Sequence, residues 1–280
     1  MRRGYFNQRL NDALELHVFP GFEDNYFYLI ASMNSQSCVV VDPGNASELL
    51  QFIKDSGRTL EAILLTHHHR DHTGGVGELI DHSPHAEIVC SPWLKTPPAW
   101  EKYTIKRIEP SGSFFSLETE FKVIDVRGHT IDHIAFAVGG LNSGRSVCDV
   151  FVGDSVFGAG CGGLFEGTHE QMLEGLRRLK ALHWATNLWC AHEYTIKNLR
   201  IARLLNEDNP KQVERLIKLE TQLTTQGIEP HQLVTLPLTV GEELSTNPFF
   251  RCDTTELQKT VDTTDELATF KKVRAFRDQF

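Results

Sequence analysis

The residues of this chain whose types and spacing best suit chemistry are three histidines and an aspartate in the segment T-H-H-H-R-D-H, residues 66–72. The strand-like run LEAILLT leads into this segment, so the side chains of His67 and His69 project to the same side just past the strand end. Asp71 and His72 follow in a turn and can face a second position. Imidazole and carboxylate groups without a thiolate suit Zn²⁺, Fe²⁺ or Mn²⁺. The segment therefore predicts a metal site rather than a surface turn that happens to be rich in histidine.

Further ligand-type residues follow other apolar strands downstream. His129 follows FKVIDVRG, Asp154 follows VFVG, and His192 follows NLWCA. Taken singly, each has an ordinary interpretation as a turn residue, but functional groups gather at the carboxyl ends of strands in α/β sheets. Together with the first segment they predict one site of seven ligands. His68 and Arg70 alternate out of this set and are interpreted as supporting or exposed residues.

The elements that must position these residues are strands in the first 190 residues and helices after about residue 193. Runs rich in β-branched and aromatic residues, such as NYFYLIA and SCVVVDPG, end in turn residues and predict strands. TIKNLRIARLLNED and KQVERLIKLETQL have the helical period and are separated by Pro210. We therefore expect a mixed α/β domain over residues 1–193 and a smaller helical domain over residues 194–280. Capping patterns predict three further helix starts: Asn45 with Glu48, Thr168 with Gln171, and Thr263 with Glu266.

Composition and charge exclude several classes of protein. Hydrophobic residues make up 40% and charged residues 23%, which is a globular balance and not that of a disordered chain or a coiled coil. The net charge of −9 disfavours nucleic-acid binding, since phosphate backbones repel an acidic protein. The sequence contains no apolar run of about 18 residues, the length that a membrane span requires. The N-terminus does not resemble a secretory signal. Six isolated cysteines predict free thiols in a reducing cytosol, so we expect a cytoplasmic protein.

Several motifs resemble known proteins. T-H-x-H-x-D-H after a strand, followed by G-H-T, G-D and H-E-Y, resembles the metallo-β-lactamase superfamily. FEDNYFYLI, VDPG, GCGGLFEGT, AHEYT, NPFFR and the final VRAFRDQF resemble the glyoxalase II (hydroxyacylglutathione hydrolase) family within it. The resemblance covers almost the whole chain, including the helical tail that distinguishes this family from most of its relatives. It implies an α/β fold, an αββα sandwich followed by a smaller helical C-terminal domain.

The resemblance also implies a thioesterase with two divalent metal ions per chain. Zn is the expected metal, with Fe or Mn as alternatives. The implied reaction is hydrolysis of S-D-lactoylglutathione to glutathione and D-lactate, the second step of methylglyoxal detoxification, by a hydroxide that bridges the metals. Asp71 and Asp154 are the implied catalytic residues. The implied ligands are His67, His69 and His129 for the first metal, Asp71, His72 and His192 for the second, and Asp154 as the bridge.

The same resemblance implies substrate contacts. Tyr194 matches a residue that touches glutathione, and Arg274 and Arg277 match two basic positions that meet its glycine carboxylate. Gly163 and Phe165 stand where the family often has a basic residue and a tyrosine, so we expect weaker affinity for glutathione. The expected partner is a small-molecule glutathione thioester, with no nucleic acid and no membrane, and the expected assembly is a monomer.

One alternative from a different reaction class stays open. It is a mononuclear iron dioxygenase of the same superfamily that acts on glutathione persulfide. That class uses only part of the ligand set and lacks the long helical tail, so a count of metals per chain separates the two. A β-lactamase is disfavoured because Asp154 stands where such enzymes often have a cysteine.

Overall fold

A seven-stranded sheet forms the first layer of the protein. The computed structural model describes residues 4–139, 148–206 and 209–280. The strands of this sheet lie side by side in chain order, antiparallel from β1 to β4 and parallel from β4 to β7. They are β1 (Phe6–Arg9), β2 (Leu14–Gly21), β3 (Asn25–Ser32), β4 (Ser37–Val41), β5 (Thr59–Leu64), β6 (Glu87–Cys90) and β7 (Ile105–Arg107).

A second sheet has the order β15-β14-β11-β10-β9-β8, and a short hairpin of β12 and β13 stands beside it. Its central strands are uniformly buried runs such as IAFAV and DVFVG, as expected for strands covered on both faces. The strands are β8 (Ser113–Ser116), β9 (Thr119–Asp125), β10 (Ile134–Val138), β11 (Asp149–Gly153), β12 (Val156–Phe157), β13 (Gly160–Cys161), β14 (Asn187–Cys190) and β15 (Leu238–Thr239).

The two sheets pack face to face and helices cover their outer faces. Tyr28 of the first sheet and Phe136, Phe151 and Trp189 of the second are fully buried between them. Leucines and isoleucines of α1 and α3 cover the outer face of the first sheet, and α4 covers that of the second. The αββα sandwich is thereby confirmed. The helices are α1 (Ser47–Ser56), α2 (Arg70–Thr73), α3 (Val76–His82), α4 (His169–Lys180), α5 (Thr195–Leu205), α6 (Pro210–Gln226), α7 (Val240–Thr246), α8 (Thr255–Thr260) and α9 (Glu266–Arg277).

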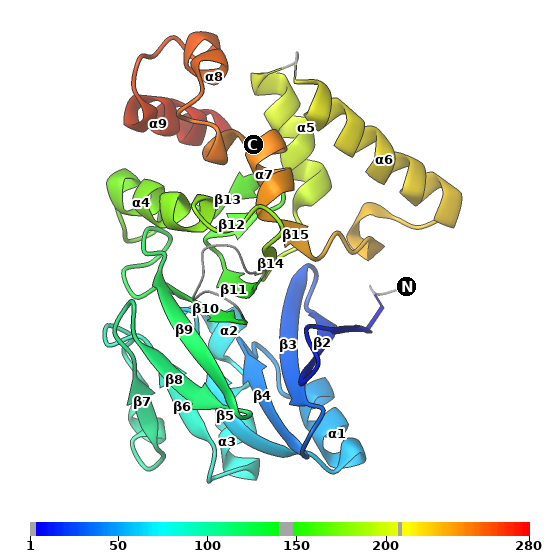
Figure 1. The fold of residues 1–280 in the computed structure, drawn as a ribbon, viewed down its shortest axis with the longest axis vertical. Coiled ribbons are helices and arrows are strands. Elements are labelled where there is room, and N and C mark those ends of the chain that lie inside the picture. The colour runs from blue at the N-terminus through cyan, green and yellow to red at the C-terminus, as the bar shows by residue number, and fades with distance from the viewer. Residues whose placement is uncertain (1–3, 140–147, 207–208) are drawn as a thin grey trace.

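The C-terminal helices α5 to α9 gather at one end of the sandwich (Figure 1). They are tied to it at several points. The two-residue strand β15 lies in this tail and pairs with β14, so the tail completes the second sheet. Phe270 and Val273 of α9 share a core with Leu173 and Leu176 of α4. The boundary between the two domains at residues 193–194 stays a prediction.

Two further observations bear on the sequence-based expectations. All six cysteines are buried and unpaired, so the prediction of free thiols is confirmed. Among the described residues, no helix has the length and apolar character that crossing a bilayer requires.

The helix starts were predicted with mixed success. Thr168 and Gln171 form the expected capping box of α4. The other two starts are wrong, because a different residue occupies the N-cap position. Ala46 precedes α1 without a side-chain cap, while Asn45 accepts a hydrogen bond from the Ser47 N–H in a local turn. At α9 the cap is Asp265, two residues after the predicted Thr263; it accepts from the Ala268 N–H at 2.8 Å.

Candidate metal centre

The predicted ligands meet at one end of the sandwich because they follow the carboxyl ends of neighbouring strands. His67 and His69 come after β5, His129 after β9, Asp154 directly after β11, and His192 after β14. Strands β11 and β14 are parallel neighbours, which brings Asp154 and His192 to the same edge of the second sheet. The face-to-face packing of the sheets brings the β5 residues opposite them. All of these side chains except His69 are buried.

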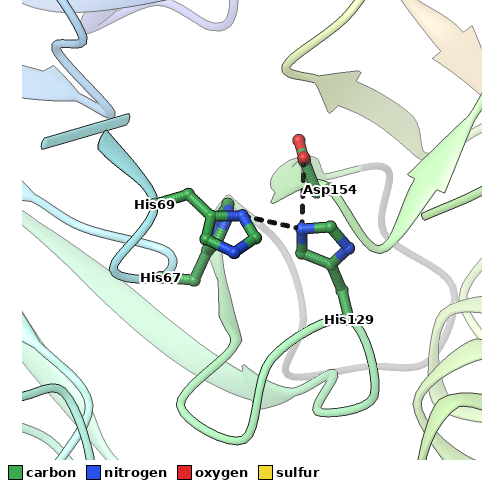
Figure 2. Close-up of side chains that lie close together, drawn as sticks. All are labelled: His67, His69, His129 and Asp154. Atoms are coloured by element: carbon green, nitrogen blue, oxygen red, sulfur yellow. Dashed lines mark hydrogen bonds and ion pairs between the residues drawn. The ribbon is translucent and has the colours of Figure 1, made fainter. Parts of the chain in front are cut away.

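Three imidazoles and one carboxylate form the first group of ligand-type side chains. One ligand atom from each of His67, His69, His129 and Asp154 lies within 4.8 Å of the others. Figure 2 shows these side chains converging from separate segments of the chain. The His129 Nε2 atom lies 3.1 Å from His69 Nδ1 and 3.4 Å from the Asp154 Oδ2 atom.

The second group consists of Asp71, His72 and His192, again with ligand atoms within 4.8 Å of one another. The Asp71 Oδ2 atom lies 3.3 Å from His192 Nε2 and 3.5 Å from His72 Nε2. The Asp154 Oδ1 atom lies 3.4 Å from each of the same two nitrogens. One oxygen of Asp154 therefore faces the first group and the other faces the second, the geometry of a carboxylate that bridges two ions.

Unpaired buried atoms at the centre show that divalent metal ions fit these residues. The Nε2 atoms of His67 and His72 and the Oδ1 atom of Asp154 are buried with no hydrogen-bond partner among the described residues. A buried polar group without a partner costs about 1–3 kcal/mol. Metal coordination would remove this cost at His67 Nε2, whereas His72 Nε2 and Asp154 Oδ1 also face each other as an ion pair at 3.4 Å. A donor set of imidazole and carboxylate suits Zn²⁺, Fe²⁺ or Mn²⁺.

Burial and charge set the protonation of the centre in the absence of metal. Burial and neighbouring histidines lower the pKa of His67 well below its usual value, so its imidazole is neutral. Burial also opposes the charged forms of His72 and Asp154, but their mutual attraction outweighs it. The pKa of His72 is therefore raised and that of Asp154 lowered. Metal binding would displace the proton from His72, since only a neutral imidazole coordinates a metal.

Carboxylates behind the histidines fix which nitrogen faces the centre. His72 donates from Nδ1 to the Asp42 Oδ2 atom at 3.0 Å, and His192 donates from Nδ1 to the Asp24 Oδ1 atom at 2.7 Å. Both rings therefore present Nε2 to the ligand groups. Such carboxylate–histidine pairs orient metal ligands and raise their basicity. Neither aspartate was among the predicted site residues.

The position of Asp154 depends on a histidine that is not a ligand. His133 is fully buried and accepts the Asp154 backbone N–H at its Nε2 atom, at 3.2 Å. Its Nδ1 atom faces the Val126 carbonyl oxygen at 3.3 Å, so both ring nitrogens are used. Burial lowers the pKa of His133 to about 3, which keeps it neutral. Gly153 has φ +51°, and a Cβ there would lie 2.7 Å from His133 Nε2, so only glycine fits at this turn.

Three of the predicted substrate residues surround the ligand groups. The Phe165 ring, 72% exposed, lies 5.4 Å from the His69 ring and 5.2 Å from the His129 ring. Tyr194 stacks on the His192 ring with the centroids 5.1 Å apart. The Gly163 carbonyl oxygen accepts a hydrogen bond from His129 Nδ1 at 2.8 Å. All three residues therefore contact a histidine of the ligand groups.

The two predicted arginines differ in their surroundings. Arg274 is buried, donates to the carbonyl oxygens of Cys161 and Gly162, and forms an ion pair with Asp278 at 2.6 Å. Its guanidinium supports the loop that leads to Gly163 and does not reach solvent. Half-buried Arg277 has one partner among the described residues, Asn198 Oδ1 at 3.3 Å from its Nε atom. Of the two arginines, Arg277 is thus the one that is partly open to solvent.

Replacing Asp24 with alanine should weaken metal binding about 10–100-fold, because His192 would lose the partner that orients its ring. The measurement is metal affinity by competition with a chelator. Asp12→Ala is the matched control, since Asp12 is an exposed aspartate that pairs with Arg9 of β1. Equal affinities in the Asp24 and Asp12 variants would show that Asp24 does not support a ligand.

Both parts of the chain match known protein families. Residues 20–200 match the family model of the metallo-beta-lactamase superfamily, and residues 193–280 match that of the hydroxyacylglutathione hydrolase C-terminus. The chain is 38% identical over 274 residues to the hydroxyacylglutathione hydrolase of Photobacterium profundum, covering 95% of this chain and 100% of that protein. A relative of the same name from Synechococcus sp. is 38% identical over 261 residues, covering 93% of this chain and 98% of that protein.

A solved structure shares the fold at low identity. The metallo-beta-lactamase from Staphylococcus aureus subsp. aureus COL superposes with a TM-score of 0.63 and 18% identity, over 94% of this chain and 72% of that one. At this identity the likeness concerns the fold alone. The family models span both parts of the chain, and the curated relatives are matched over nearly their whole length. The chain therefore belongs to the hydroxyacylglutathione hydrolase family of the metallo-β-lactamase superfamily.

Proposed function

We propose that this enzyme hydrolyses S-D-lactoylglutathione to glutathione and D-lactate, the second step of methylglyoxal detoxification. The observation that carries the proposal is the placement of Asp154 between two groups of histidines and aspartates, in a chain whose residues 193–280 match the hydroxyacylglutathione hydrolase C-terminus. The placement of Asp154 between the two groups is what a hydrolase with two metals needs. The match of the C-terminal residues and the names of the relatives support a glutathione thioester as the substrate.

The proposed metals are two Zn²⁺ ions, with Fe²⁺ or Mn²⁺ as alternatives for the same donor set. His67, His69 and His129 would hold the first and Asp71, His72 and His192 the second, with Asp154 shared. When bound, the two ions lower the pKa of water toward neutrality and polarise the thioester carbonyl.

The protein's own groups hold the reacting atoms in place. Asp154 is ionised and buried between the two groups, so its charge offsets the repulsion between two cations. Asp71 is fixed by a hydrogen bond from Asn25 Nδ2 at 3.0 Å and keeps its side chain 38% exposed, so this ligand stands at the open side of the centre. The leaving group is a thiolate of pKa about 8.5, which departs without strong acid assistance.

The glutathione moiety would lie towards the C-terminal helices. We propose that Tyr194 contacts it and that Arg277 binds its glycine carboxylate. Phe165 and the backbone of Gly163 would form the opposite wall, since both adjoin His129. We assign Arg274 to positioning this wall, because its side chain is buried and its Nη1 donates to the carbonyl oxygens of Cys161 and Gly162.

Replacing Gly163 with lysine should lower KM about tenfold, equivalent to about 1.4 kcal/mol, by supplying a cation for the substrate carboxylates. The site has room for it: the nearest atom to a Cβ would be Phe165 Cε2 at 3.5 Å, which is ordinary contact. Gly77→Lys is the control, because Gly77 lies in open space on α3. Steady-state kinetics that give the same KM for both variants would remove Gly163 from the substrate site.

The experiment that tests the function is turnover of S-D-lactoylglutathione by protein of measured metal content. We expect two metals per chain, and we expect a chelator that removes them to abolish hydrolysis. The persulfide dioxygenase alternative instead requires one iron per chain and oxygen uptake with glutathione persulfide. Hydrolysis absent at full metal occupancy would refute the proposal.

We also propose that the enzyme acts as a monomer in the cytoplasm, without nucleic acid or membrane. All seven proposed ligands come from one chain, so no second copy is needed to complete the centre. Six unpaired buried thiols suit a reducing compartment. Sedimentation at equilibrium tests the monomer, and fractionation of cells tests the compartment.

A further inference from the structure

The open side of the metal centre leads into a cavity that none of the proposed glutathione contacts lines. The cavity has a volume of about 640 Å³. One of its lining residues is Asp71, a proposed metal ligand, so the cavity begins at the centre itself. We call this space the Asp71 cavity. It is lined by Phe22, Gly44, Asn45, Arg70, Asp71 and Gly74.

One wall of the Asp71 cavity consists of backbone from the turn after β4 and the turn after α2. A Cβ on Gly44 would collide with the Asp71 carbonyl oxygen, and a Cβ on Gly74 would lie 2.6 Å from the Gly44 carbonyl oxygen. Only glycine permits such a close approach of two backbone segments. This wall is therefore fixed, and the side chains of the other lining residues decide what the cavity binds.

Phe22 holds an exposed aromatic ring at the Asp71 cavity through an unusual backbone conformation. Its φ is +46°, in the left-handed region that a bulky residue seldom adopts. The residue is 55% exposed, and its ring packs edge-on against Phe27 with the centroids 5.6 Å apart. Backbone strain of this kind concentrates at ligand sites. The ring thus offers an apolar surface to a carbon chain in the cavity.

Arg70 is the cation of the Asp71 cavity. It is exposed, and its guanidinium has no ion pair or hydrogen bond with residues 4–139, 148–206 or 209–280. The neighbouring carboxylate does not pair with it, because the Asp71 Oδ2 atom faces His192 Nε2 at 3.3 Å and His72 Nε2 at 3.5 Å. Asn45 adds amide donors, since its Oδ1 atom already accepts a backbone N–H at 2.8 Å. Together these groups suit an anionic oxygen ligand.

The layout of the proposed substrate site directs the acyl group to this cavity. The proposed glutathione contacts Tyr194 and Arg277 belong to the C-terminal part of the chain, and Phe165 adjoins His129. With the thioester carbonyl at the ligand groups, the sulfur and the acyl chain leave the carbonyl carbon on different sides. The acyl chain would therefore lie on the side where Asp71 stands.

On the basis of the proposed function, we propose that the Asp71 cavity receives the acyl group of the thioester and that Arg70 selects acyl groups that end in a carboxylate. The substrates would be glutathione monothioesters of dicarboxylic acids. Guanidinium and carboxylate form paired, charge-assisted hydrogen bonds, and the Phe22 ring would cover the methylenes of the acyl chain. The reaction is unchanged: water adds to the thioester carbonyl, the C–S bond breaks, and glutathione and the dicarboxylic acid leave.

The test compares two substrates of the holoenzyme that differ only at the far end of the acyl group. They are S-adipoylglutathione and the same thioester with its adipoyl carboxylate methylated, with rates corrected for spontaneous hydrolysis. We expect the wild type to have a kcat/KM at least about tenfold higher for the free carboxylate. Arg70→Gln should remove this preference. Arg70→Lys should keep part of it, because lysine retains the charge but not the paired donors.

The preference is a ratio measured on one protein, so a change in the folding or metal content of a variant cancels. Arg200→Gln is the matched control and should keep the preference, because Arg200 is an exposed arginine of α5 that pairs with Glu220. S-D-lactoylglutathione is assayed on the same preparations. Its hydrolysis without a carboxylate preference in the wild type, or with the preference retained in Arg70→Gln, would overturn this inference alone. Failure to hydrolyse any of the thioesters at full metal occupancy would overturn the proposed function as well.

Discussion

Asp154→Ala should reduce kcat at least about a hundredfold and lower the metal content of the protein, since the shared support of a two-metal site would be lost. The reason lies in the two oxygens of this side chain. Oδ2 faces His129 of the first group, and Oδ1 faces His72 and His192 of the second, each at 3.4 Å. Alanine removes the only proposed ligand common to both groups and leaves the repulsion between the two cations without its central negative charge.

The measurement is kcat for S-D-lactoylglutathione together with metal per chain. Asp149→Asn is the matched control. Asp149 is also a buried carboxylate and begins β11, the strand that ends directly before Asp154, but it accepts hydrogen bonds from Asn187 and Trp189. We expect the control to keep its metal and its kcat. Near-normal kcat in correctly folded Asp154→Ala protein would contradict the assignment of the bridge.

Arg277→Ala should raise KM about ten- to a hundredfold, the loss expected when a charge-assisted hydrogen bond of about 1.5–3 kcal/mol is removed. Arg277 is the family-matched cation whose donors are mostly free, and Gly163 provides no second cation nearby. The proposed contact is remote from the thioester, so kcat should change less than KM, the pattern of lost uniform binding.

A substrate without the glycine carboxylate separates binding from folding. On this truncated thioester, wild type and Arg277→Ala should have similar KM values. Arg274→Ala should instead impair both substrates alike, because its guanidinium supports the carbonyl oxygens of Cys161 and Gly162. Lys271→Ala on the same helix is the control with no expected effect on KM, since Lys271 pairs with Glu170. Equal losses on both substrates in Arg277→Ala would assign this residue to the fold.

The ligand groups could be predicted from the sequence because two local signals coincide there. The first signal is the residue type, because histidine and aspartate are metal ligands. The second is an apolar strand immediately before the residue, which places it at the edge of a sheet. His129, Asp154 and His192 each carry both signals. These signals predicted one site of seven ligands, and the family resemblance implied how the seven divide between two metals.

The supporting residues lacked such local signals. Asp24 lies in a turn between two strands, and its partner His192 is 168 residues away, so only the folded chain brings them together. Asp42, in the VDPG turn, reaches His72 in the same way. The sequence also did not predict which arginine is buried. Arg274 and Arg277 both lie in the final helix, but Arg274 is buried and Arg277 is partly exposed.

Short elements were also beyond prediction. Strand β15 has only two residues and no alternation to recognise, and its pairing with β14 is decided by the packing of the tail. At α9 the N-cap is Asp265, two residues after the predicted Thr263, because its carboxylate accepts from the Ala268 N–H.

The pairing of β15 with β14 has a consequence for how the protein unfolds. Strand β14 ends two residues before His192, so the strand that carries a proposed ligand is held on one side by the C-terminal tail. Melting of the tail would release that strand edge, and loss of metal would loosen the same strand from the other end. A higher metal concentration should therefore raise the unfolding temperature of the tail helices together with that of the sandwich. The reason is that the metal binds the folded state, and the two parts unfold as a single cooperative unit.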